Sequence, residues 1–164
     1  MSAGRTSRSR LVWAGYLACG WGLAFAAISF YWGSGGTLGT ETVWGSLTMS
    51  PSQRTILLAA VWVTGFLKVF AALLALALVA RWGSRLPRRP IAVLGWCAAV
   101  VLTLYGGINV VGEALTASGV VKPSEPVDWK PLLWHLYVWD MSFLIWGLLL
   151  ALAAWQFTRS KSDS

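Results

Sequence analysis

The 164-residue sequence has little charge, one histidine and two cysteines. Charged residues make up 12 % of the chain and hydrophobic residues 57 %, whereas soluble domains hold roughly 25 % and 45–50 %. This shortage of charge excludes a soluble globular fold, a disordered chain and a fibrous repeat. The single histidine, His135, excludes a multi-histidine site, so the sequence predicts no metal and no cofactor. Cys19 and Cys97 do not form a C-x-x-C pair, which argues against thiol-driven quinone chemistry.

Long apolar runs dominate what is present, and the mean hydropathy is +0.63. A membrane-spanning helix needs about 20 consecutive, mostly apolar residues. Four stretches qualify, namely Leu11–Gly33, Ile56–Ala80, Ile91–Ala117 and Pro131–Phe157. The predicted fold is therefore an all-α integral membrane protein with four transmembrane helices in one bundle. Residues 11–157 form its membrane domain, and the short tails 1–10 and 158–164 leave no room for a soluble domain.

The positive charges gather on one predicted side of the membrane. The net charge is +7, and most lysines and arginines lie in the two tails and in the loop Arg81–Pro90. Because short loops rich in these residues mark the cytoplasmic side, we expect both termini inside a bacterial cell, in its plasma membrane. The loops Ser34–Thr55 and Ser118–Lys130 then face outward. The charge predicts membrane lipids as partners and no nucleic acid, because there is no folded basic domain.

The first predicted span admits a second interpretation. Its basic start, apolar core and Ala24-Phe25-Ala26 triplet are also features of a cleaved signal peptide. However, the apolar run continues past the triplet to Trp32, longer than is usual for a signal peptide. Small residues also recur every fourth position, which favours close helix packing in a bilayer. This small-residue stripe, which predicts a retained helix, consists of Ala14, Ala18, Gly22 and Ala26.

The few polar residues inside the predicted spans are functional candidates, because such residues are costly in hydrocarbon. Lys68 lies near the predicted midplane, and Asp140 differs from it in depth by about one helical turn. Asn109 and Glu113 share a face of the third span at positions i and i+4. We expect these four residues to form a polar cluster open to the outer side. The cluster is either a ligand-binding site or an interhelical clamp built on a Lys68–Asp140 pair.

Three residues of the fourth span are secondary candidates. His135 precedes Asp140 by five positions, an angle of roughly 140° on an ideal α-helix, so the two are not expected to form a tight same-face pair. His135 aligns better with Ser142, and a proton relay through Glu113 is an alternative role. Trp139 lies deep enough that its indole N–H needs an acceptor, and it is a candidate pocket-lining residue.

The loop Ser34–Thr55 starts with the glycine-rich run Gly33-Ser34-Gly35-Gly36-Thr37-Leu38-Gly39. This run lacks the lysine and the preceding strand of a phosphate-binding loop, so it predicts a flexible exit from the first span. Further along the loop, Glu41 and Trp44 are expected to fold over the mouth of the bundle.

Four short motifs occur in order along the chain: Tyr31-Trp32-Gly33-Ser34-Gly35-Gly36, Gly65-Phe66-Leu67-Lys68, Gly112-Glu113 and Trp139-Asp140-Met141-Ser142-Phe143-Leu144-Ile145-Trp146-Gly147. With this order, the sequence resembles the bacterial four-span family called domain of unknown function 3995, over about residues 11–157. The resemblance implies four membrane helices. It implies no established activity, so it adds no mechanism.

Three functional hypotheses follow from the sequence. The first is a membrane protein that binds or transports a small or lipid-like molecule at the polar cluster; transport predicts a homodimer, because one four-helix bundle offers little room for a path. The second is an accessory or assembly subunit of a larger membrane complex, which predicts a small-residue stripe left facing outward. The third is a membrane enzyme acting on lipid or quinone, which requires a cluster residue with a perturbed pKa. No catalytic residue is assigned.

Overall fold

The described residues contain four helices that are long and apolar enough to cross a membrane, which confirms the predicted helical class and the predicted number of membrane-length helices. The computed structural model describes residues 12–45, 50–124 and 126–159, and these ranges contain no β-strand. The first three of the four helices are α2 (Val12–Gly33), α4 (Pro51–Val79) and α5 (Arg88–Ala117). The fourth runs continuously from Trp129 to Arg159 and consists of α6 (Trp129–Trp134), the π-helical segment η2 (His135–Trp139) and α7 (Asp140–Arg159). Leu11, the tail 1–10 and residues 160–164 of the second tail lie outside the described residues.

Three of the helices begin earlier than the apolar runs predict, and one of them is the fourth span, which begins at Trp129 rather than Pro131. Helix α4 starts at Pro51 rather than Ile56, because Ser50 caps it: the Ser50 hydroxyl accepts from the Gln53 amide, and the Gln53 side chain accepts from the Ser50 amide. This reciprocal pair satisfies two backbone N–H groups at the start of the helix. Helix α5 likewise begins at Arg88 rather than Ile91. The first turns of α4 and α5 are polar, and a prediction based on apolar runs leaves them out, so the predicted spans start too late.

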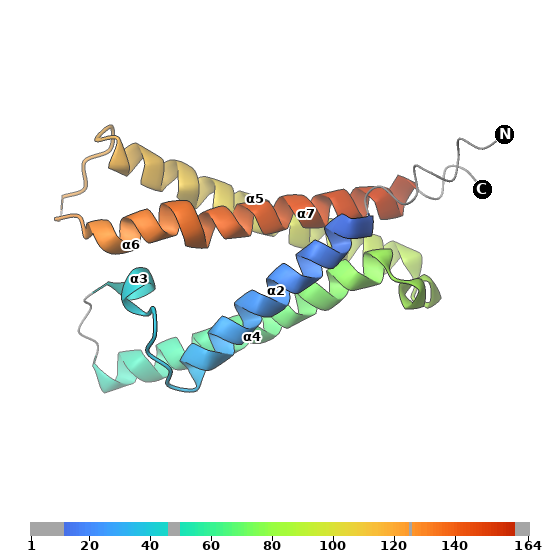
Figure 1. Cartoon of the computed structure of the whole chain (residues 1–164), viewed down its shortest axis with the longest axis horizontal. Coiled ribbons are helices and arrows are strands. Elements are labelled where there is room, and N and C mark those ends of the chain that lie inside the picture. Colours follow the sequence, from blue (N-terminus) through green and yellow to red (C-terminus); the bar gives the residue numbers. More distant parts are fainter. Residues whose placement is uncertain (1–11, 46–49, 125, 160–164) are drawn as a thin grey trace.

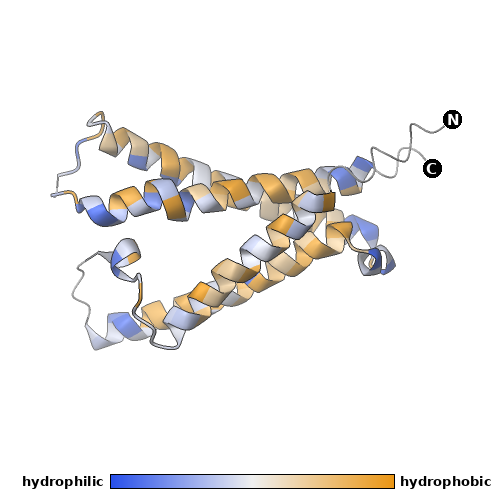
Figure 2. Ribbon diagram, in the orientation of Figure 1, coloured by the Kyte–Doolittle hydropathy of each residue, from blue (hydrophilic) through white to orange (hydrophobic). Residues whose placement is uncertain are grey.

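The helices alternate in direction along the length of the molecule (Figure 1). Helix α2 packs along α4, α5 packs along α7, and α7 also contacts α2 and α4. The two pairs lie close together at the end that carries the 3₁₀ turn η1 (Arg81–Arg85) and diverge toward the other end, where the short helix α3 (Glu41–Trp44) lies between them. Figure 2 shows hydrophobic residues along the helices and hydrophilic ones near the two ends.

Small residues let the two helix pairs approach closely. The stripe on α2 is buried within the molecule: Ala14 and Ala18 are fully buried and Ala26 is 2 % exposed. At Gly22, an added Cβ would lie 2.5 Å from the ring of Trp146 on α7 and 3.0 Å from the Cβ of Ala72 on α4. The stripe is therefore used in packing within the molecule and does not face outward.

Glycines also bring α5 and α7 into backbone contact. A Cβ added at Gly106 would lie 2.7 Å from the carbonyl oxygen of Asp140, and one added at Gly147 would lie 2.5 Å from the amide nitrogen of Thr103. Ordinary Cβ contacts lie at 3.4–4 Å, so both positions require glycine. The Gly106 contact is the one that matters for the polar residues, because it sets the distance between α5 and the first residue of α7.

Candidate functional site

The π-helical segment η2 brings His135 and Asp140 together. In η2 the Asp140 amide donates to the His135 carbonyl, the i→i+5 bond of a π-helix. The longer turn places the two side chains on one face, and His135 Nδ1 lies 2.6 Å from Asp140 Oδ2. The prediction that these residues do not pair was therefore wrong, because it assumed α-helical geometry throughout. Neither proline nor glycine occurs in His135–Trp139 to mark the change of helix type.

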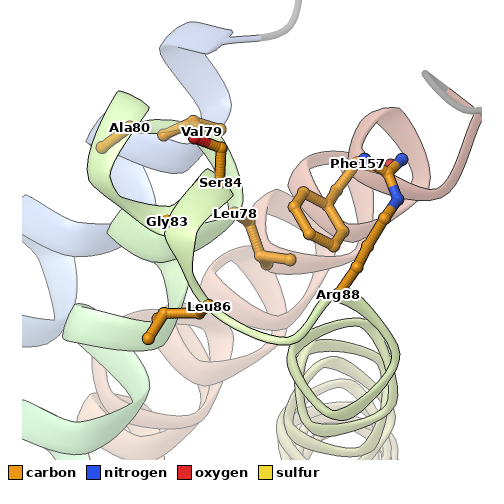
Figure 3. A pocket seen from close by; sticks show the side chains of 8 residues that line it. All are labelled: Leu78, Val79, Ala80, Gly83, Ser84, Leu86, Arg88 and Phe157. Carbon is orange, nitrogen blue, oxygen red and sulfur yellow. The ribbon is translucent and has the colours of Figure 1, made fainter.

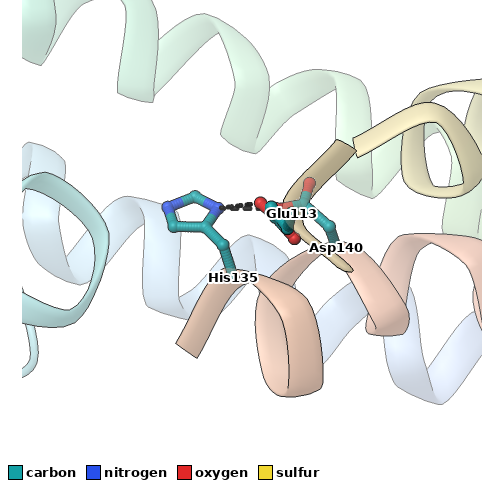
Figure 4. A group of neighbouring side chains, drawn as sticks. All are labelled: Glu113, His135 and Asp140. Atoms are coloured by element: carbon teal, nitrogen blue, oxygen red, sulfur yellow. Dashed lines mark hydrogen bonds and ion pairs between the residues drawn. The ribbon is translucent and has the colours of Figure 1, made fainter. Parts of the chain in front are cut away.

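Two residues of α5 join this pair. Asn109 Nδ2 donates to Asp140 Oδ1 at 3.3 Å, and Glu113 Oε1 lies 3.8 Å from His135 Nδ1. Asp140 is 2 % exposed, and Glu113 Oε2 is buried with no hydrogen-bond partner among the described residues. Figure 4 shows the three ionisable side chains converging from α5, η2 and the start of α7. We call Glu113, His135 and Asp140 the acid–histidine cluster.

Helix α3 covers the cluster through backbone and side-chain hydrogen bonds. His135 Nε2 lies 3.2 Å from the Val43 carbonyl, and since a carbonyl only accepts, Nε2 carries the hydrogen. Trp139 Nε1 donates to the Thr42 hydroxyl at 3.2 Å, so the deep indole N–H has an acceptor, as its depth requires. The Thr42 hydroxyl in turn donates to the Gly39 carbonyl at 2.6 Å. The Val43 contact holds one side of the histidine ring and leaves Nδ1 to the carboxylates, while Thr42 holds the neighbouring Trp139.

An ion pair ties α3 to the start of α6. Lys130 Nζ lies 3.2 Å from Glu41 Oε1, and both side chains are about half exposed. A backbone hydrogen bond at Glu41 and the Lys130 ammonium hold the pKa of the Glu41 carboxyl below its usual value. On the other side of α3, the rings of Trp32 and Trp44 pack with centroids 5.5 Å apart. The expectation that Glu41 and Trp44 fold over the bundle end is confirmed.

Lys68 lies apart from the acid–histidine cluster. Its Nζ donates to the Ser29 hydroxyl on α2 at 2.7 Å and lies 5.6 Å from the centroid of the Phe143 ring. The ion pairs of the described residues do not include one between Lys68 and Asp140. The expected Lys68–Asp140 clamp is therefore wrong. Lys68 connects α4 to α2 through Ser29, whereas Asp140 connects α7 to α5 through Asn109.

Of the predicted site residues, the structure thus joins Asn109, Glu113 and Asp140 and adds His135, while Trp139 contacts the cover. Ser142 is buried in α7, two positions beyond Asp140. Two hydroxyl residues that were not predicted also take part: Ser29, which is 2 % exposed, and Thr42. A hydroxyl in the first span is a signal that would have suggested Ser29, whereas Thr42 lies in a short helix that the sequence does not reveal.

A second feature lies at the opposite end of the molecule. A cavity of about 270 Å³ is lined by Leu78, Val79, Ala80, Gly83, Ser84, Leu86, Arg88 and Phe157 (Figure 3). The Arg88 guanidinium lies over the Phe157 ring, 4.6 Å from its centroid, and donates to the Phe157 carbonyl. This cavity contains none of the predicted site residues, so the acid–histidine cluster is the stronger candidate for chemistry.

The fold and the site together define a class: a protein whose described residues form four membrane-length helices and a partly buried acid–histidine cluster under a short helix at one end. The chain belongs to the family described as "Protein of unknown function (DUF3995)", whose model matches residues 22–150. This confirms the resemblance seen in the sequence, and the matched range contains the whole cluster. No curated protein and no solved structure shows a significant match to the chain. The family description assigns no activity, so a function can be inferred only from the geometry of the site.

Proposed function

We propose that this protein is a multi-pass protein of the bacterial plasma membrane that binds a small polar ligand at the acid–histidine cluster, from the outer side. Both termini lie in the cytoplasm. The observation that carries the proposal is the convergence of three ionisable side chains from separate elements beneath α3. Buried ionisable groups are costly in a membrane protein and are functional candidates for that reason.

The charge distribution supports this orientation. Arg81, Arg85, Arg88 and Arg89 lie in or beside η1, at the end of the molecule opposite α3. The positive-inside rule places that end in the cytoplasm. The cluster and its α3 cover then lie near the outer surface, where a ligand from outside the cell reaches them without crossing the bilayer.

The burial of the site supports binding over a purely structural role. A structural polar network is stable when every member has its partners, because unpaired buried polar atoms cost free energy. Here Glu113 Oε2 has no partner among the described residues, although Asp140 is hydrogen-bonded to both His135 and Asn109. A ligand that engages Glu113 completes the network.

Native mass spectrometry of the full-length protein, extracted gently from bacterial membranes, tests this function. We expect a bound ligand on the wild type that is lost in Glu113→Gln, which keeps the size of the side chain and removes its charge. Lys68→Met is the control: it removes an intramembrane charge outside the cluster and keeps the ligand. Wild-type protein without any adduct contradicts the proposal, and so does an adduct that Glu113→Gln retains. A second protein bound to a bare chain would favour the accessory-subunit hypothesis.

A further inference from the structure

We propose that the ligand of the acid–histidine cluster is one divalent first-row transition metal ion, held by Glu113, His135 and Asp140. This inference names the ligand class for the site proposed above and rests on that proposal. It differs from the sequence expectation of no metal, which considered only sites with several histidines.

The spacing of the donor atoms suits a metal ion. One ligand atom from each of the three residues lies within 4.8 Å of the other two. Bonds from zinc to nitrogen or oxygen are about 2.0–2.2 Å long, so two ligands of one ion lie up to roughly 4.2 Å apart. The 3.8 Å between His135 Nδ1 and Glu113 Oε1 falls within that limit. The direct contact of 2.6 Å between His135 and Asp140 has to open slightly as the ion enters.

The groups around the cluster aim the donor atoms inward. Metal-binding histidines usually donate their other N–H to a carbonyl or carboxylate, which fixes the ring and its tautomer. His135 does so through Nε2 to the Val43 carbonyl, leaving Nδ1 directed at the carboxylates. Asn109 holds Asp140 Oδ1 and leaves Oδ2 facing His135. Both outer contacts are thus present around the three proposed ligands.

The charge of the site also calls for a cation. Two carboxylates share a largely buried space, and like charges in such a space repel one another. The described lysines of the neighbouring elements are engaged elsewhere, Lys68 with Ser29 and Lys130 with Glu41. With both carboxylates ionised and the histidine neutral, a divalent ion balances the two negative charges and gives Glu113 Oε2 a partner.

The donor set indicates which ions fit. Imidazole nitrogen with carboxylate oxygen suits zinc, iron and manganese, whereas calcium and magnesium prefer oxygen alone. Three protein ligands leave at least one coordination position open for water or another molecule. Such a site holds its ion and remains accessible from the α3 end.

Zinc binding by the purified full-length protein tests the inference. The detergent-solubilised protein is stripped with a chelator, loaded with Zn²⁺, freed of excess metal and analysed for metal content and affinity. We expect a single zinc ion per chain in the wild type and at least a tenfold weaker affinity in Glu113→Gln and His135→Gln. Asp128→Asn is the matched control: Asp128 caps α6 by accepting from the Lys130 amide, and asparagine caps equally well. This control removes a carboxylate near the same end and keeps the wild-type affinity.

A further variant separates loss of metal binding from loss of the fold. Asn109→Ala leaves all three ligands in place, and removal of such an outer contact typically weakens metal binding by about 10- to 100-fold. Helix content by circular dichroism is measured for each variant. Zinc retained equally by Glu113→Gln and Asp128→Asn overturns the inference, as does a wild type that binds no zinc and no cobalt. If the native protein then still carries an organic adduct that Glu113→Gln loses, only the metal assignment fails; without any adduct, the proposed function fails as well.

Discussion

The backbone contact between Gly106 on α5 and Asp140 on α7 predicts that helix packing positions the Asp140 side chain. Gly106→Ala adds a single methyl group where two helix backbones touch. That carbon would lie 2.7 Å from the Asp140 carbonyl oxygen and 2.9 Å from the Leu144 Cα. Both are backbone atoms, so no side chain can rotate out of the way, and α5 has to move away from α7.

The structure allows the cost to be estimated. The nearest atom to the added carbon is the Leu144 amide nitrogen, and the Asp140 contact alone is about 0.7 Å short of an ordinary Cβ contact. Overpacking of this kind costs roughly 1–3 kcal/mol. The neighbouring Gly107→Ala is the matched control, because its added Cβ would meet only the Leu144 Cδ1, at 3.9 Å. In the control, the better helix propensity of alanine stabilises the helix by up to about 1 kcal/mol.

The assay is unfolding of the purified protein in mixed micelles by increasing sodium dodecyl sulfate, followed by tryptophan fluorescence. We expect Gly106→Ala to unfold at a lower fraction of the denaturing detergent than the wild type, and Gly107→Ala at an equal or higher fraction. Zinc affinity falls with Gly106→Ala as well, because a shift of α7 lengthens the 3.3 Å bond from Asn109 to Asp140. Equal stability of the two alanine variants would refute the view that backbone contact at Gly106 positions Asp140.

Two further predictions concern the α2–α4 pair and the orientation. Ser29→Ala leaves the Lys68 ammonium without its hydroxyl partner and destabilises the protein by about 1.5–3 kcal/mol, the range for hydrogen bonds to charged groups; adding Lys68→Met recovers part of this loss in the same unfolding assay, and no recovery would contradict the pairing. In a cysteine-free background, Val120→Cys, at a position that is 73 % exposed, reacts with a membrane-impermeant maleimide on intact cells, whereas Ser84→Cys reacts only after lysis. The reverse labelling pattern would show that the protein has the opposite orientation in the membrane.

The number of membrane-length helices and the helical class follow from the amino-acid sequence alone. Span prediction depends on length and on local composition, and each apolar run carries that signal independently of its neighbours. The sequence also identified Asn109, Glu113 and Asp140 as members of one cluster. Asn109 and Glu113 share a helix face at i and i+4, and an intramembrane Asp at a similar depth is a natural partner for them.

The pairing of the polar residues depends on how the helices pack. His135 reaches Asp140 because η2 is π-helical, and that change in helix type leaves no mark in the local sequence. Lys68 meets Ser29 instead of Asp140, because α4 packs along α2 and turns this face toward it. Such choices depend on the rotation and separation of whole helices. Those quantities follow from the combined packing of small residues such as Gly22 and Gly106 against partners far away in the chain, which no single segment specifies.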